Sequence, residues 1–146
     1  MTSRVKIHGR CLCGKVHFEA EAPSADVVVC HCGMCQRWAW GPLHSLEVKG
    51  DSVKIEGEEN ISVYVSSEWG ERVFCKTCGT GMIWRTRTGS YHSVNAGAVT
   101  DKSGLNFASE IFFDEKPAYY QFANPSHKMT GAEAMAALLG SSDKTE

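Results

Sequence analysis

Short segments in which apolar and polar residues alternate run through most of this chain. In residues 15–22, Val16, Phe18, Ala20 and Ala22 alternate with charged or polar neighbours, which is the period of a strand with one buried face. Other segments are shorter and rich in β-branched or aromatic residues, with turn residues between them. These patterns predict further strands at residues 5–7, 27–29, 43–48, 53–55, 61–66, 71–74, 82–84, 91–94 and 111–113.

Two segments depart from the strand pattern. A Gly-Pro pair predicts a loop over residues 37–42, because these residues favour turns over regular structure. Residues 130–133 match the capping box that opens a helix, and alanine-rich sequence follows as far as a stop at Gly140. The sequence therefore predicts a mainly β fold of meander type with one short helix at its end, followed by a disordered tail at residues 141–146.

Composition narrows the class of protein. The chain has 146 residues, of which 42% are hydrophobic, enough for one domain to build a core without disulfides. The net charge is −2, from 15 basic and 17 acidic residues, so no basic excess favours nucleic acid as a partner. No apolar run has the length of a signal peptide or of a membrane span. We therefore expect a cytoplasmic protein without a membrane partner.

All seven cysteines fall into three short clusters. A disulfide framework and a metal site both use closely spaced cysteines, but thiols stay reduced in the cytoplasm, which favours metal. Zinc takes four ligands in a structural site and three protein ligands in a catalytic one. The cysteines divide accordingly into a set of four, Cys11, Cys13, Cys75 and Cys78, and a set of three, Cys30, Cys32 and Cys35.

The spacings fit these two roles. Residues i and i+2 of a strand share a face, so a bend after Cys11 directs both it and Cys13 toward one ion. The glycine after Cys78 tolerates the positive φ that ends a zinc knuckle. The set of three leaves one zinc position open, where a thiol could bind, lose its proton and attack a small electrophile such as an aldehyde.

Other interpretations remain open. His31, His44 or His92 could close the set of three as a structural Cys3His zinc, although His31 is more simply a core or exposed histidine that faces away from the metal. An iron–sulfur cluster or rubredoxin-like iron would favour other spacings. A thioredoxin-like role for Cys75 and Cys78 would need a βαβ context, which the surrounding strands do not provide.

The motifs CxCG at residues 11–14, CHCxxC at residues 30–35 and CxxCGT at residues 75–80 together resemble the glutathione-dependent formaldehyde-activating enzyme family, which includes centromere protein V. The resemblance extends to an aromatic segment that ends near residue 120. It implies a zinc-binding β-tent fold of antiparallel sheets over residues 4–125. The helix predicted from the capping box would then form an extension at residues 126–140. The resemblance further implies a structural zinc on Cys11, Cys13, Cys75 and Cys78 and a catalytic zinc on Cys30, Cys32 and Cys35.

The activity that the resemblance implies is that of a carbon–sulfur lyase, which condenses formaldehyde with glutathione to S-hydroxymethylglutathione. Family members often read Trp-Ser-Gly-Gly-Pro after the third cysteine, where this chain has Trp38, Ala39, Trp40, Gly41 and Pro42. Trp40 could line a substrate pocket, but the simpler expectation is a core position. Arginine side chains could clamp a peptide carboxylate or be ordinary solvated charges; the candidates are Arg37, Arg85 and Arg87.

Two hypotheses follow. The first is a zinc-dependent lyase that acts on a thiol–aldehyde adduct, with two zinc ions per chain and with glutathione and formaldehyde as the implied partners. The second is a non-enzymatic interaction module in which both zinc ions are structural. They differ in whether the zinc at Cys30, Cys32 and Cys35 has an exchangeable ligand.

Overall fold

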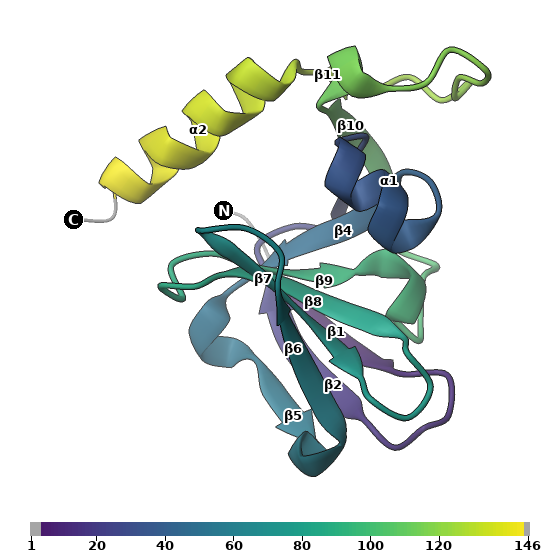
Figure 1. Cartoon of the computed structure of the whole chain (residues 1–146), viewed down its shortest axis with the longest axis vertical. Coiled ribbons are helices and arrows are strands. Elements are labelled where there is room, and N and C mark those ends of the chain that lie inside the picture. Colours follow the sequence, from purple (N-terminus) through teal and green to yellow (C-terminus); the bar gives the residue numbers. More distant parts are fainter. Residues whose placement is uncertain (1–3, 145–146) are drawn as a thin grey trace. The chain divides into compact units, whose positions relative to one another are not determined.

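Figure 1 shows the computed structural model of the chain, which describes residues 4–144. Strands make up most of the regular structure, so the predicted mainly β fold is confirmed. The strands are β1 (Val5–Arg10), β2 (His17–Ala22), β3 (Asp26–Cys30), β4 (Leu43–Val48), β5 (Lys54–Glu56), β6 (Ile61–Val65), β7 (Gly70–Cys75), β8 (Gly81–Thr86), β9 (His92–Asn95), β10 (Asn106–Ile111) and β11 (His127–Lys128). The helices are α1 (Gly33–Ala39) and α2 (Gly131–Lys144), with 3-10 turns η1 (Gly50–Ser52), η2 (Glu58–Asn60), η3 (Ala96–Ala98) and η4 (Phe113–Glu115).

The chain folds into two compact units, each assembled from two separate segments. Unit 1 combines the chain up to Ala25 with Ser45–Leu105, and unit 2 combines Asp26–His44 with the chain from Asn106 onward. Each unit contains one of the two expected cysteine sets. The units are defined by contacts between separate segments, so they do not test the predicted domain, which covers residues 4–125 without interruption. That domain stays a prediction.

Unit 1 contains two antiparallel sheets. One has the strand order β1-β2-β5. In the other the order is β4-β9-β8-β7-β6, and β4 belongs to this unit from Ser45 onward. Strand β2 buries Phe18, Ala20 and Ala22, while the residues between them are less buried, so the predicted alternation is confirmed. Gly9 of β1 packs so closely on the Phe18 ring that a side chain would not fit there. This packing of β1 on β2 fixes the strand that leads to Cys11.

Unit 2 is built on parallel strands, which differ from the antiparallel sheets that the sequence predicts. Strand β10 pairs in parallel with β3 and also with β11. The predicted strand at residues 111–113 is wrong except at its first residue, because Phe112 adopts a left-handed conformation and Phe113 begins η4. The strand lies upstream instead, and Ile111 pairs with Cys30 at the end of β3.

Helix α1 extends into the loop that the sequence predicts at residues 37–42, so that prediction is wrong at residues 37–39, whereas residues 40–42 lie outside regular structure. Cys32 is its N-cap, and the Cys32 sulfur accepts a hydrogen bond from the Cys35 N–H. The helix ends at Trp40, which has a φ of 68°, and the following Gly-Pro pair prevents its continuation. The Trp40 side chain is 95% exposed, so the expectation that it fills core is wrong.

Helix α2 begins as the sequence predicts. The Glu133 N–H donates to the Thr130 hydroxyl at 3.1 Å and the Thr130 N–H donates to the Glu133 carboxylate at 2.8 Å, which confirms the capping box. The helix continues past Gly140 to Lys144, so it includes part of the tail that was expected to be disordered; residues 145–146 lie outside the described part. Among the described helices, none combines the length and the apolar character that crossing a bilayer demands.

Among the described residues other than glycine, Trp40 and Phe112 have a left-handed backbone, and we expect substitution by glycine to have opposite effects at these two positions. Trp40→Gly should raise the free energy of unfolding by about 0.5–1 kcal/mol, because it removes a left-handed backbone penalty and gives up almost no buried surface. Phe112→Gly relieves a similar φ of 54°, but it removes a ring that packs on the cluster around Cys30 and Cys35. We expect Phe112→Gly to lower the free energy of unfolding by about 2–3 kcal/mol. Urea denaturation followed by circular dichroism measures both, and a destabilised Trp40→Gly would show that the indole makes stabilising contacts.

Candidate metal centres

The four-cysteine cluster of unit 1 forms where two chain turns meet. Cys11 and Cys13 follow β1, and Cys75 ends β7, with Cys78 in the turn after it. All four Sγ atoms lie within 4.8 Å of one another. The Sγ atom of Cys13 lies 3.6 Å from that of Cys11 and 3.8 Å from that of Cys75. Four sulfurs at 2.3 Å from a tetrahedral zinc would be separated by about 3.8 Å, so the donor set fits such an ion.

Backbone and hydroxyl donors surround these sulfurs. The Val16 N–H donates to the Cys11 sulfur at 3.4 Å. Thr80 links the two turns, because its hydroxyl oxygen accepts from the Leu12 N–H at 3.0 Å and lies 3.2 Å from the Cys78 sulfur. This hydroxyl is the main cause that lowers the pKa of Cys78, to about 5. These contacts stabilise thiolates, which are the form that binds metal.

The three-cysteine cluster lies in unit 2, at the junction of β3 and α1. Cys30 ends β3, Cys32 caps α1 and Cys35 lies in its first turns, and their Sγ atoms also lie within 4.8 Å of one another. The Cys30 and Cys35 side chains are buried and that of Cys32 is half-buried. An apolar wall packs against them, formed by Ala39, Leu43, Ile111 and Phe112.

Electrostatics in this cluster favour a cation. Hydrogen bonds from the Cys30 and Cys35 thiols hold the pKa of Cys32 well below its usual range, and the same contacts raise the pKa of Cys30. Because three thiolates at this separation repel one another, a positive ion would stabilise their ionised form. All seven cysteines lie in the described part of the chain and none of them forms a disulfide, so the structure does not support the disulfide framework.

His31 is held away from the cluster that it interrupts. It is fully buried, its Nε2 lies 2.8 Å from a Glu110 carboxylate oxygen, and its Nδ1 lies 3.2 Å from the Tyr120 hydroxyl. Within unit 2, His44 is also engaged elsewhere, because its Nδ1 lies 3.2 Å from the Pro42 carbonyl. Among the described residues, the group that could hold a metal ion at this site therefore consists of three cysteines, without a fourth His, Cys, Asp or Glu side chain.

Glu110 and its partners are functional candidates that the sequence did not indicate. The Glu110 carboxylate is 1% exposed and accepts a hydrogen bond from the Ser126 hydroxyl at 2.6 Å. Although burial opposes ionisation, the bonds from Ser126 and His31 hold the pKa of Glu110 below its usual value. Spacing along the chain gives no signal for such a network, because Glu110 and His31 are 79 residues apart.

Of the three arginines that the sequence suggests for substrate contact, two have partners in unit 1 and one lies on α1 in unit 2. The Arg85 Nε donates to the Glu71 carboxylate at 2.7 Å, and Arg87 donates to the Glu68 carbonyl at 3.2 Å. Both lie in unit 1, where Arg85 is partly buried in its ion pair with Glu71 and Arg87 follows the end of β8. Arg37 lies in the last turn of α1, the helix that also carries Cys35, so it stays a candidate for substrate contact.

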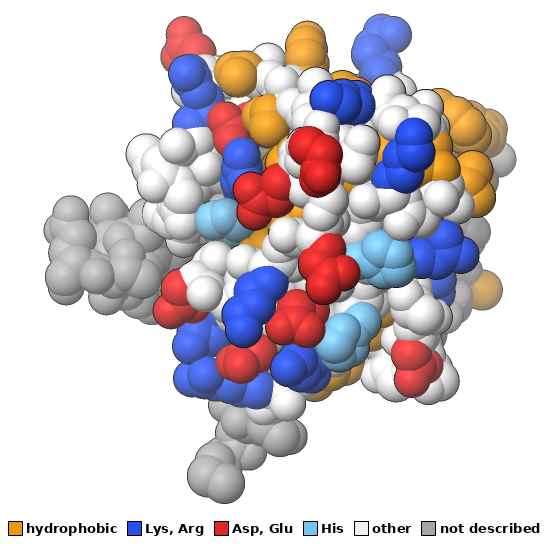
Figure 2. Space-filling view, turned by 90° about the horizontal axis from the view of Figure 1, so that it is seen from below, with side chains coloured by type: hydrophobic (Ala, Val, Ile, Leu, Met, Phe, Trp, Pro, Cys, Tyr) orange, Lys and Arg blue, Asp and Glu red, His pale blue; other side chains and the backbone are white. Residues whose placement is uncertain are grey.

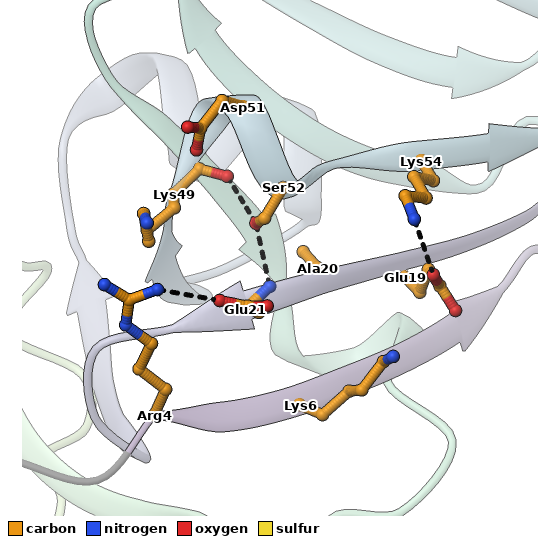
Figure 3. Close-up of a pocket in the computed structure, with 9 residues that line it drawn as sticks. All are labelled: Arg4, Lys6, Glu19, Ala20, Glu21, Lys49, Asp51, Ser52 and Lys54. Atoms are coloured by element: carbon orange, nitrogen blue, oxygen red, sulfur yellow. Dashed lines mark hydrogen bonds and ion pairs between the residues drawn. The ribbon is translucent and has the colours of Figure 1, made fainter.

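Among the described residues of unit 1, the charged side chains form no further group that could hold a metal ion. On the face drawn in Figure 2, acidic and basic side chains are intermingled. A pocket of about 310 Å³ lies beside β1 and β2 and is drawn in Figure 3. Within it, Arg4 pairs with Glu21 at 3.2 Å and Lys54 with Glu19 at 3.8 Å. Its basic groups are thus partly neutralised, and it contains none of the cysteines.

Comparisons with known proteins agree with this geometry. Residues 6–115 match the family described as glutathione-dependent formaldehyde-activating enzyme. A protein of Schizosaccharomyces pombe, described as an uncharacterised lyase, is 30% identical over 132 residues, which are 90% of this chain and 96% of the yeast protein. A crystal structure of a Rhodobacter sphaeroides protein from structural genomics has a TM-score of 0.56 at 26% identity, covering 70% of this chain and 91% of that chain.

Thr80 provides a test of the four-cysteine cluster. Thr80→Val keeps the shape of the side chain but removes the hydroxyl that contacts Cys78 and Leu12, so we expect metal affinity at this cluster to fall about 10-fold or more. Thr80→Ser keeps the hydroxyl and should bind metal like the wild type. Competition with a chromogenic chelator measures the affinity. Equal affinities for Thr80→Val and Thr80→Ser would show that the hydroxyl does not support the cluster.

Proposed function

This chain belongs to the glutathione-dependent formaldehyde-activating enzyme family, and from this premise we propose that it is a zinc-dependent carbon–sulfur lyase acting on a thiol–aldehyde adduct. The family assignment read from the three cysteine clusters is confirmed. The observation that carries the proposal is the set of three converging sulfurs at Cys30, Cys32 and Cys35, with no fourth protein ligand among the described residues. Such a set matches a zinc site with one exchangeable position.

The two clusters have different roles in this proposal. Cys11, Cys13, Cys75 and Cys78 bind a structural zinc, because four thiolates complete a tetrahedral site. Cys30, Cys32 and Cys35 bind the catalytic zinc. Two zinc ions per chain follow, and the substrates are a small thiol and an aldehyde, with glutathione and formaldehyde as the family-level pair. A cytoplasmic location stays a prediction.

The reaction itself is a reversible addition. The thiol sulfur forms a bond to the aldehyde carbon, the carbon–oxygen double bond becomes single, and the proton lost by the thiol ends on the new hydroxyl oxygen. Zinc in the three-cysteine cluster would supply a position where a thiol loses its proton at neutral pH. The chain's own residues orient that position, since β3 and α1 hold the three sulfurs on one side.

The apolar wall contributes to this chemistry. Leu43 and Ile111 pack on the buried cysteines and exclude water from the protein side of the cluster. A lower local dielectric strengthens the attraction between the thiolates and a bound cation. With three thiolates the site would carry a formal charge of −1, which makes it a weak Lewis acid toward water and leaves a bound thiol sulfur electron-rich.

One observation favours the second hypothesis, a non-enzymatic interaction module. Trp40 at the end of α1 and Tyr119 are strongly exposed, and exposed aromatic residues are typical of protein-binding surfaces. In that case both zinc ions would be structural.

Substitution of one cysteine in each cluster separates the two roles. Cys75→Ser should unfold or precipitate and lose zinc, because a closed zinc site contributes to folding. Cys35→Ser should stay folded and retain one zinc ion, where the wild type retains two. Elemental analysis and circular dichroism melting measure these outcomes. If Cys35→Ser unfolds as readily as Cys75→Ser, the three-cysteine cluster is structural.

The chemistry has its own test. Wild-type protein should accelerate the exchange between a thiol, formaldehyde and their hydroxymethyl adduct above the spontaneous rate, as measured by exchange NMR with cysteine and with glutathione. Trp40→Gly should increase the rate with glutathione relative to cysteine, because an indole at the end of α1 restricts a tripeptide more than a single amino acid. Cys35→Ser is the inactive control. If protein that retains two zinc ions does not raise the exchange rate above the spontaneous rate with any thiol, the lyase reaction is excluded and the interaction module is favoured.

A further inference from the structure

Each of the four polar atoms of His31, two in the backbone and two in the ring, lies within hydrogen-bond distance of a partner. The His31 N–H donates to the Ile111 carbonyl at 3.0 Å, and the His31 carbonyl accepts from the Gln36 side chain at 2.7 Å. The ring nitrogens face Glu110 and Tyr120. A fully buried residue with four such contacts cannot rotate without breaking several hydrogen bonds.

The Glu110 carboxylate is anchored in turn. One oxygen lies 2.8 Å from the His31 Nε2, and the other accepts from the Ser126 hydroxyl at 2.6 Å and lies 3.7 Å from the Lys128 ammonium. The backbone of Glu110 is also held, because its carbonyl accepts from the Met129 N–H at 2.9 Å. The network thus connects the residue between two cysteines to strands β10 and β11.

This arrangement determines where two sulfurs point. Successive side chains of an extended segment face opposite ways, so a His31 ring locked toward Glu110 directs the neighbouring Cys30 and Cys32 to the other side. A freely turning His31 would let that short segment twist and separate the two sulfurs. We propose that His31 is a positioning residue of the three-cysteine metal site and that the Glu110 carboxylate and the Tyr120 hydroxyl lock its ring. The inference rests on metal binding at this cluster in the proposed function, but not on the lyase reaction.

Glu110 lies within the family match, but the other polar side chains that contact the His31 ring or the Glu110 carboxylate follow it. That match ends at residue 115, whereas Tyr120, Ser126 and Lys128 all follow it and all contact His31 or Glu110. The segment between η4 and α2 is therefore more than a connection to the C-terminal helix, because it completes the support of the metal-binding turn.

The test measures release of zinc from each cluster into a chromogenic chelator. Cys35→Ser should lack zinc at the three-cysteine cluster, so the kinetic phase of zinc release that is missing in this variant belongs to that cluster. Glu110→Gln keeps the shape of the side chain and removes its charge, and it should speed that phase about 10-fold while leaving the phase of the four-cysteine cluster unchanged. In cobalt-substituted protein, the sulfur-to-cobalt absorption of the three-cysteine cluster should shift as its geometry loosens.

Two further variants make the result specific. Tyr120→Phe removes a single hydroxyl and should speed the same phase by a smaller factor, so it decides the question if Glu110→Gln does not fold. Glu71→Gln is the matched control, since it removes the charge of a carboxylate that accepts from Arg85 at 2.7 Å in unit 1, and it should leave release from the three-cysteine cluster unchanged. Wild-type release rates in folded Glu110→Gln or in folded Tyr120→Phe would overturn the positioning role.

Equal acceleration of zinc release from both clusters would also overturn the positioning role of His31, because a general loss of stability would then explain the result. The proposed function fails separately. If the wild-type cluster binds no metal, both proposals are wrong, whereas a metal-loaded protein without exchange activity contradicts only the lyase reaction.

Discussion

Mutual repulsion of thiolates that must converge on one point is the constraint on which this structure depends. Two unit charges 4 Å apart repel by about 4 kcal/mol at an effective dielectric constant of 20, and each cluster holds its sulfurs within 4.8 Å of one another. Amide and hydroxyl donors reduce this cost, and a bound cation reverses it. Strands β3 and β7 end at Cys30 and Cys75, and Cys11 directly follows β1, so three strand ends lie at such points.

Much of the architecture follows from local sequence. The alternation in β2 predicts its buried face, the capping box predicts the start of α2, and the cysteine spacings predict which thiols converge. Helix α1 could not be predicted in this way, because the N–H of Gly33 in its first turn donates to the Glu115 side chain, 82 residues away. The Gly-Pro pair that suggested a loop instead marks the end of this helix.

The remaining differences also arise from contacts between distant segments. The parallel pairing of β3 with β10 depends on register, which no short pattern encodes. The sequence around His31 does not show whether its side chain is exposed or buried. In the structure the ring is buried against Glu110, which comes from the other segment of unit 2. Trp40 is the reverse case: hydrophobicity favours a buried position, but the left-handed end of α1 directs the indole outward.

The interleaving of the two units has a consequence for the newborn protein. The four cysteines of unit 1 have all been added by residue 78, whereas β3 of unit 2 must wait for β10. At about 5–20 residues per second, the 79 residues from His31 to Glu110 take roughly 4–16 seconds to synthesise. During that interval Cys30, Cys32 and Cys35 lack the part of their apolar wall formed by Ile111 and Phe112, and they lack the buried Glu110 carboxylate. The order of the segments along the chain therefore lets the four-cysteine cluster assemble first, and the pace of the ribosome sets how long the other cluster waits.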